Sequence, residues 1–174
     1  AIKHDITIYA AHPNMDVVAN GVSGRMADKL DLYHRQVLQP EGDPMAGNGF
    51  VIIGKLQQPV ESMAFLQQVK EIFRCDRLRY TTPHTPSIQR VAVCGGAGAS
   101  FFKQALAGQA DIYISGDFKY HDFFLTENRI MIADIGHYES EQFTKEIFYE
   151  ILTKKISKFA VQFSEINTNP IKYL

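Results

Sequence analysis

The stretch that decides the fold spans residues 110–141 and reads ADIYISGDFKYHDFFLTENRIMIADIGHYESE. It contains two short apolar runs, at residues 112–115 and 130–133, which are typical of buried strands. Each run leads directly into a polar cluster, the first at residues 116–122 and the second at residues 134–141. Because ligands of α/β sheets bind where loops leave the carboxyl ends of strands, the two clusters are predicted to form two walls of one site.

A helix is predicted to follow the second cluster. His137 and Glu141 stand four residues apart at its start, so both side chains leave one helical face and can meet a single cation. The apolar residues that define the helix recur at helical spacing. They are Phe143, Ile147, Phe148, Ile151 and Leu152.

A similar unit of strand, polar loop and helix is predicted near the start of the chain. Residues 6–10 form a β-rich run, and the loop that follows contains His12 and Asp16. Asp16 either caps the next helix or offers its carboxylate to the site, and His12 either makes a structural hydrogen bond or joins the site. The inner side of the helix is apolar. Its members are Val18, Val22, Met26, Ala27 and Leu30.

The remaining patterns complete an α/β protein with a layered, mixed sheet flanked by helices. The turn-rich residues 39–49 are predicted to be a loop or a hinge, so the chain forms one compact unit or two lobes joined near residues 40–50. Further strands are predicted at residues 50–54, 77–80, 91–94 and 159–163, and further helices near Pro59 and Phe101.

Three glycines follow the predicted strand at residues 91–94, as Gly95, Gly96 and Gly98. A glycine-rich turn before a helix can direct backbone N–H groups at an anion such as phosphate. The spacing matches neither the P-loop nor the dinucleotide-binding fingerprint. We therefore favour tight packing of strand against helix as the explanation and keep the anion seat as the alternative.

The composition narrows the class of protein. The 174 residues carry a net charge of -1, with the basic residues scattered, so neither nucleic acid nor a membrane surface is an expected partner. Cys75 and Cys94 show no paired spacing, which indicates a reducing, cytoplasmic environment. The longest apolar runs are far shorter than a membrane helix requires. The chain begins at Ala1, and we expect further sequence upstream in the natural protein.

Three pairs of polar residues each follow a predicted strand, and their convergence indicates a metal or acid–base site. A network of ion pairs is the alternative. Mixed imidazole and carboxylate ligands suit Zn²⁺, Mn²⁺, Fe²⁺ or Ni²⁺ and do not distinguish among them. The pairs are His12 with Asp16, Asp117 with His121, and His137 with Glu141.

Four segments, VAVCGGAGASF, ADIYISGDFKYHDF, IADIGHYESEQF and SEINTNPIKYL, resemble the NGG-one-interacting-factor-three-like family. Its bacterial members are often called GTP cyclohydrolase 1 type 2 homologues. The early IYAAHPNMD resembles the same family's His-x-x-x-Asp segment, so the resemblance runs through nearly the whole chain. It implies an α/β fold, a toroidal homohexamer and a site for two divalent metal ions that faces an internal cavity.

The resemblance assigns metal-ligand roles to Asp16, His137 and Glu141. The family also supplies adjacent histidines from a Thr-His-His-Pro motif, and these 174 residues contain no such pair. The chain is therefore expected to be the later part of a longer family protein, in which some members carry an inserted domain near residues 40–50. The resemblance places three further polar residues beside the metals. These are His12, Asp117 and His121.

Two functions follow as hypotheses from the resemblance. The first is a metal-dependent hydrolase that acts on GTP or another small phosphorylated substrate, with His121 as proton shuttle and Asp117 and His12 beside it. The second is a non-catalytic, hexameric metal-binding scaffold or regulator. Apolar residues at Phe123, Phe124 and Leu125 add to the expectation of a homo-oligomer.

Overall fold

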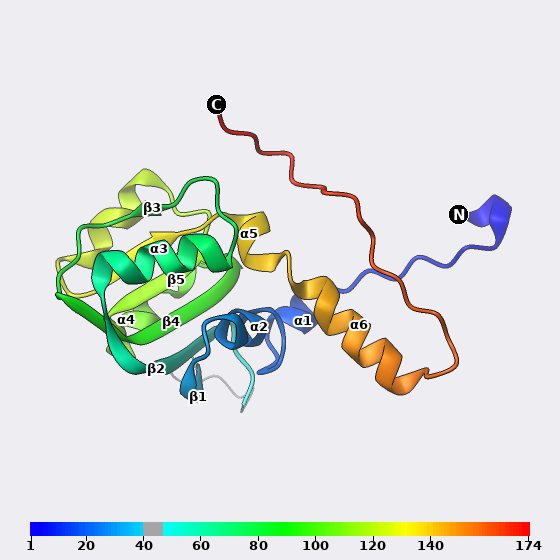
Figure 1. Cartoon of the computed structure of the whole chain (residues 1–174), viewed down its shortest axis with the longest axis horizontal. Helices are drawn as coiled ribbons and strands as arrows, with labels where there is room; N and C mark the ends of the chain where they lie inside the picture. Colours follow the sequence, from blue (N-terminus) through cyan, green and yellow to red (C-terminus); the bar gives the residue numbers. More distant parts are fainter. Residues whose placement is uncertain (40–46) are drawn as a thin grey trace.

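A mixed β-sheet lies at the centre of the molecule (Figure 1). The computed structural model describes residues 1–39 and 47–174. Within these ranges the sheet has six strands in the spatial order β1-β2-β4-β5-β6-β3. Strands β4, β5 and β6 run parallel, and the other neighbours pair antiparallel. The strands are β1 (Tyr33–Leu38), β2 (Val51–Glu61), β3 (Arg79–Tyr80), β4 (Ser87–Ala97), β5 (Ile112–Gly116) and β6 (Met131–Asp134).

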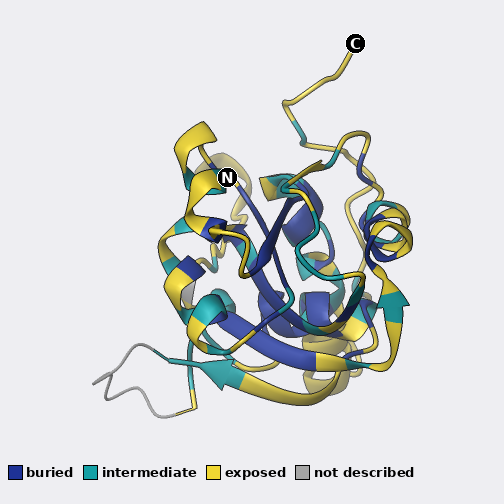
Figure 2. Ribbon diagram, turned by 90° about the vertical axis from the view of Figure 1, so that its left-hand side faces the viewer, coloured by how far each residue is buried: buried dark blue, intermediate teal, exposed yellow. Residues whose placement is uncertain are grey.

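The central strands are apolar because both of their faces are covered. All five residues of β5 and all four of β6 are buried (Figure 2). Their alternate side chains enter two separate clusters. Ile112 and Ile114 point into the cluster beneath α2 and α3, and Tyr113 points into the cluster beneath α4. The predicted α/β architecture with a layered, mixed sheet is confirmed.

Helices cover both faces of the sheet. Helices α2 and α3 pack on one face through residues such as Met26 and Phe65, and α4 packs on the other through Phe102 and Ala105. The α-helices are α1 (Pro13–Asp16), α2 (Val22–Lys29), α3 (Ser62–Ile72), α4 (Phe102–Ala107), α5 (His137–Glu141) and α6 (Thr144–Lys155). The 3-10 helices are η1 (Ile2–His4), η2 (Ala99–Phe101) and η3 (Tyr120–Thr126). No helix in the described part of the chain is long and apolar enough to cross a membrane.

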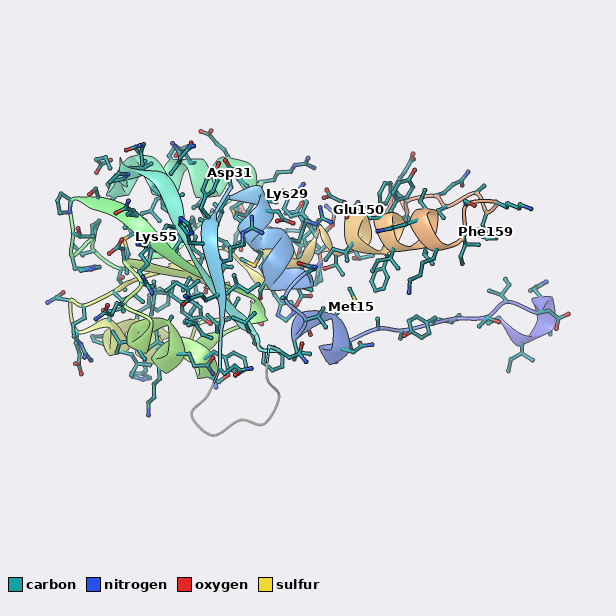
Figure 3. The ribbon with its side chains drawn as sticks, turned by 90° about the horizontal axis from the view of Figure 1, so that it is seen from below. Met15, Lys29, Asp31, Lys55, Glu150 and Phe159 are labelled. Carbon is teal, nitrogen blue, oxygen red and sulfur yellow. The ribbon has the colours of Figure 1, made fainter. Side chains whose placement is uncertain are left out.

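Helix α6 and the N-terminal segment extend away from the sheet, and the C-terminal segment returns from the far end of α6 toward α5 (Figure 1). Ion pairs join the first turns of α6 to α2, with Lys29 Nζ 3.0 Å from Glu146 Oε2 and Arg25 Nη2 2.7 Å from Glu150 Oε2. Beyond that point every residue from 151 to 160 is exposed. Figure 3 shows Glu150 nearer the sheet and Phe159 at the far end of this projection.

Two predicted strands are wrong. Residues 6–10 and 159–163 are extended, but they pair with no strand among the described residues. Their apolar side chains are mostly exposed, as Ile8 at 78% and Phe159 at 68% show. Apolar alternation gives a segment the pattern of a strand, but it becomes one only if a sheet edge accepts its backbone.

Two helix starts also differ from the prediction. Pro59 lies inside β2, where the register with β4 shifts and the missing N–H breaks no regular ladder. The helix begins instead after Glu61, whose carboxylate accepts hydrogen bonds from the N–H groups of Met63 and Ala64. Asp16 does not cap α2, because it ends α1 and Gly21 occupies the cap position.

Two other predictions concern the loop at residues 39–49 and the apolar residues 123–125. Most of the predicted loop at residues 39–49 lies outside the described residues, and the strands on either side of it, β1 and β2, pair with each other. Phe124 and Leu125 are 65% and 48% exposed, and Phe123 packs against the core. Assembly into a homo-oligomer stays a prediction.

Candidate metal centre

Asp134 fixes the two polar loops to each other. Strands β5 and β6 end side by side, so the loops that follow them start from the same edge of the sheet. The Asp134 carboxylate, only 4% exposed, accepts hydrogen bonds from the N–H groups of Phe118 at 3.1 Å and Gly136 at 3.0 Å. It also accepts one from the guanidinium of Arg79 on β3. The two predicted walls are therefore held together by one buried carboxylate.

His137 lies between two carboxylates at the start of α5. Its Nδ1 is 2.6 Å from Asp117 Oδ2, and its Nε2 is 3.3 Å from Glu141 Oε1. Asp117 reaches the ring because its backbone adopts a left-handed conformation with φ 58°. If the proton sits on Nδ1 and is donated to Asp117, the lone pair of Nε2 points towards Glu141. Metal-binding histidines are usually held in this way by a carboxylate on the other nitrogen.

Gly96, near the end of β4, provides the space for this pair. Its φ is +65°, and a Cβ at this position would lie 2.5 Å from Glu141 Oε1 and 3.3 Å from His137 Nε2. The Gly96 N–H donates to Ser140 Oγ at 2.8 Å, and the Ser140 hydroxyl donates to the His137 carbonyl at 2.7 Å. The turn, the serine and the histidine are thus one connected unit.

The same contacts decide between the two explanations of the glycines. The N–H of Gly95 donates to Ser23 Oγ at 3.1 Å, and that of Gly96 is occupied by Ser140. A Cβ on Gly95 would lie 2.4 Å from a methyl group of Val22 on α2. The glycines serve close packing, and the alternative of an anion seat is contradicted for these two N–H groups.

Asp16 adds a third carboxylate to the electrostatics of the site. Burial raises the pKa of Asp16, and the charges of His12 and His137 act in the opposite direction. Burial also raises the pKa of Glu141, with His137 lowering it and Asp16 raising it. Burial alone would lower the pKa of His137, but the hydrogen bond with Asp117 and the surrounding carboxylates outweigh it and raise that pKa. A cation that binds beside such carboxyl groups stabilises their ionised form and lowers their raised pKa values.

The donors fit a metal ion in type and in spacing. Two ligand atoms bonded at about 2.1 Å to a tetrahedral ion are about 3.4 Å apart, close to the 3.3 Å between His137 Nε2 and Glu141 Oε1. Over residues 1–39 and 47–174, no three His, Cys, Asp or Glu side chains are already gathered closely enough to hold an ion. His137 and Glu141 thus form a two-donor pair, and Asp16 would have to move closer to complete it.

The structure brings three of the six predicted site residues into direct contact, namely Asp117, His137 and Glu141. Asp16 acts on His137 and Glu141 through its charge, and two residues lie at the margin. His12 is exposed and contributes its charge to Asp16 and Glu141. His121 is exposed, and its ring packs edge-on against Tyr120 at 5.4 Å. The shuttle role of His121 stays a prediction.

Two cavities open beside His137, and both are lined by Ile171 from the C-terminal segment 167–174, here called the tail. The first, the α5 cavity, has a volume of about 450 Å³ and also includes Glu141. The second, the arginine cavity, has a volume of about 440 Å³ and also includes Asp117 and Arg77. The sequence indicates the tail only through the family resemblance, because the contacts of the tail with the site are non-local.

Comparison with known proteins identifies the family. A family model described as Duf34/NIF3 (NGG1p interacting factor 3) matches residues 1–170. A GTP cyclohydrolase 1 type 2 homolog of Streptococcus pneumoniae is 36% identical, and the alignment covers 99% of this chain and 67% of that protein. The homolog of Staphylococcus epidermidis is 38% identical over 72% of this chain and 35% of its own length. NIF3-like protein 1 of Drosophila melanogaster is 29% identical over 98% of this chain and 58% of its own.

Solved structures agree on the fold. A Bacillus cereus protein related to NIF3 superposes with a TM-score of 0.82 at 21% identity, covering 99% of this chain and 75% of that one. The chain spans between about a third and two thirds of the length of the named relatives. With a family model that matches nearly every residue, the chain belongs to the Duf34/NIF3 (NGG1p interacting factor 3) family.

Proposed function

We propose that this chain carries a divalent-metal site of a metal-dependent hydrolase similar to GTP cyclohydrolase 1 type 2, with His137, Glu141 and Asp16 as ligands. The observation that carries the proposal is the His137 ring, held through Nδ1 by Asp117 and facing Glu141 through Nε2 at 3.3 Å. The names of the relatives suggest GTP as the substrate to test first. The resemblance implies a second ion, for which the family supplies a pair of adjacent histidines that these 174 residues do not contain.

Each side chain around such a metal site would have a separate role. A bound divalent ion supplies a Lewis acid and lowers the pKa of a water molecule. Asp117 orients the His137 ring and keeps Nε2 available as a ligand. The carboxylates of Glu141 and Asp16 offset the positive charge, which imidazole ligands alone cannot do. Asp134 holds both loops in register, so that His137 and Glu141 are positioned before an ion binds.

Elemental analysis of the purified protein tests the metal site. Glu141→Gln keeps the shape of the side chain and removes its charge, and His137→Ala removes a nitrogen ligand. Both variants should lose most of the bound metal while the fold persists. Glu127→Gln is the control, because Glu127 is exposed and pairs only with Arg129 in the described structure. Unchanged metal content in both site variants would refute the proposal.

Turnover distinguishes the two hypotheses about function. The metal-loaded protein should open the ring of GTP or hydrolyse a related phosphorylated compound, and Glu141→Gln should abolish that activity. A protein that binds metal but turns over no compound in a broad screen with Mn²⁺, Zn²⁺, Fe²⁺ and Ni²⁺ would be a metal-binding scaffold instead. The turnover screen, and not the elemental analysis, therefore decides between the hydrolase and the scaffold.

A further inference from the structure

We propose that a cavity on the sheet, remote from the candidate metal centre, binds a small tetrahedral oxyanion such as phosphate or sulfate. This cavity, here called the sheet cavity, has a volume of about 170 Å³ and lies where β1, β2 and β4 run side by side. Among the described residues its lining includes two cationic side chains, a histidine and an amide, but no carboxylate. The lining residues are His34, Gln36, Ile53, Gly54, Lys55 and Arg90.

Two like charges oppose each other in this cavity. Lys55 on β2 is the direct partner of Arg90 on β4, and directly opposed residues of antiparallel strands share one face of the sheet. Like charges in this arrangement destabilise a sheet. No carboxylate in the described part of the chain forms an ion pair with either side chain. An anion bound between them would therefore remove a repulsion that the fold leaves in place.

The guanidinium of Arg90 is oriented by a backbone carbonyl. Its Nε donates a hydrogen bond to the carbonyl of Gly108, just after α4, at 2.7 Å. Its two terminal nitrogens have no acceptor among the described residues. The N–H groups of a guanidinium match the oxygens of a tetrahedral anion in geometry. Arg90 therefore positions the anion, and the ammonium group of Lys55 adds charge from the neighbouring strand.

His34 reaches the cavity through a bulge in β1, the edge strand of the sheet. The register with β2 shifts between Tyr33 and Gln36, so that His34 and Arg35 together stand opposite Gly54. His34 has φ 49°, in the left-handed region that a non-glycine residue rarely adopts. Backbone strain of this kind is concentrated at binding sites. A bulge can also protect an edge strand from pairing with another chain, an explanation that requires no ligand.

The size and the position of the cavity define the ligand. Sites for drug-sized molecules have volumes of about 300–1,000 Å³, so a cavity of about 170 Å³ suits a small ion or a terminal phosphate group. Arg90 lies near the start of β4 and Gly96 near its end, roughly 20 Å away at about 3.3 Å per residue. Figure 3 likewise separates Lys55 from Met15, the neighbour of Asp16. The anion is therefore a second ligand, and its binding does not depend on the metal centre.

Calorimetric titration of the metal-loaded protein with inorganic phosphate tests the lysine. Wild type should bind phosphate saturably at the sheet cavity. Lys55→Ala should weaken this binding about tenfold, and Lys55→Arg, which keeps the charge, should restore most of it. Lys103→Ala is the matched control, because Lys103 is an exposed lysine on α4 that does not line the cavity. It should bind phosphate as wild type does.

His34→Gly separates the ligand from the bulge. The substitution removes the imidazole and places at φ 49° the residue that adopts this conformation most readily. The affinity for phosphate should fall at least about threefold, while the Tm should stay at or above that of wild type. Wild-type affinity in both His34→Gly and Lys55→Ala would overturn the proposal and leave the bulge as a device that protects the edge strand.

The remaining outcomes concern where the phosphate binds and in what form. His137→Ala should keep the wild-type affinity for phosphate, and a loss there without one in Lys55→Ala would place phosphate on the metal and overturn the proposal. Absence of saturable binding to wild type would also overturn it. Sulfate should compete with phosphate, since it has the same shape. Glycerol 3-phosphate identifies the source: affinity equal to that of phosphate supports a terminal phosphate group as the ligand, and weaker binding supports the free ion.

Discussion

Gly96 gives the sharpest test of the proposed centre, because a single methyl group there would meet two of the three candidate ligands, Glu141 and His137. The Cβ of Gly96→Ala would lie 2.5 Å from Glu141 Oε1, closer than real Cβ atoms approach any atom. Normal van der Waals contact requires about 3.3 Å, so the carboxylate has to withdraw by about 0.8 Å. That displacement separates it from His137 Nε2, and metal affinity should fall at least about tenfold.

The substitution also has a backbone effect that must be separated from the effect on the metal. An L-residue in the left-handed region is less stable by roughly 1–2 kcal/mol, and Gly96 has φ +65°. For a chain of this size the corresponding loss in Tm is about 2–8 °C. Gly47 is the matched control, because it has φ +85° and a Cβ there would meet no atom of the described residues within 4 Å.

Two measurements on the two alanine variants resolve the question. Thermal unfolding of the metal-free proteins should show a loss of stability in both, with the larger loss at Gly96, whose Cβ also meets the Glu141 carboxylate. Metal titration should show wild-type affinity for Gly47→Ala and a large loss for Gly96→Ala. Equal metal affinities in the two variants would refute the reasoning, since the methyl group would then occupy space that no ligand uses.

Two further predictions concern the charges around the site. Asp134→Asn should lower the free energy of unfolding in urea by about 1–3 kcal/mol, because the buried carboxylate accepts hydrogen bonds from Phe118 and Gly136; unchanged stability would contradict its role in joining the loops. The pKa of His137 is raised in the folded protein, so its protonation favours the folded state at pH values below that pKa. The pKa of Glu141 is also raised, so its ionisation disfavours the folded state at pH values above that pKa. The metal-free protein should therefore become more stable as the pH falls through these raised pKa values. This gain in stability should be larger in wild type than in Glu141→Gln. Because protons displace the metal, the stability of the metal-loaded protein should decrease as the pH falls. Parallel curves of stability against pH for the metal-free and metal-loaded protein would count against the site.

The central strands were predictable because their burial requires a mostly apolar composition, which is visible in the sequence. Runs that are buried on both faces are mostly apolar, as β5 and β6 are except at Ser115 and Asp134 near their carboxyl ends. The spacing of His137 and Glu141 likewise predicted a shared helical face, and the structure places their side-chain atoms 3.3 Å apart. Local geometry of this kind depends only on residues close in sequence.

The contacts that complete the site depend on distant residues and were not predictable in this way. The bond from His137 to Asp117 requires a left-handed backbone at Asp117, which its residue type permits but does not demand. The function of Asp134 depends on three segments meeting at one carboxylate. Residues 159–163 have the alternation of a strand and remain unpaired, because a sequence pattern does not show which sheet edges are free.

The position of Asp16 has a consequence for how metal and folding are linked. His137 and Glu141 lie on a loop and helix anchored to the sheet, while Asp16 ends a four-residue helix that follows an exposed N-terminal segment. An ion that holds Asp16 to His137 would close a loop of about 120 residues, as a disulfide does, and would remove chain entropy from the unfolded state. In the proposed centre the metal is thus also a cross-link, which fastens the start of the chain to the edge of the sheet.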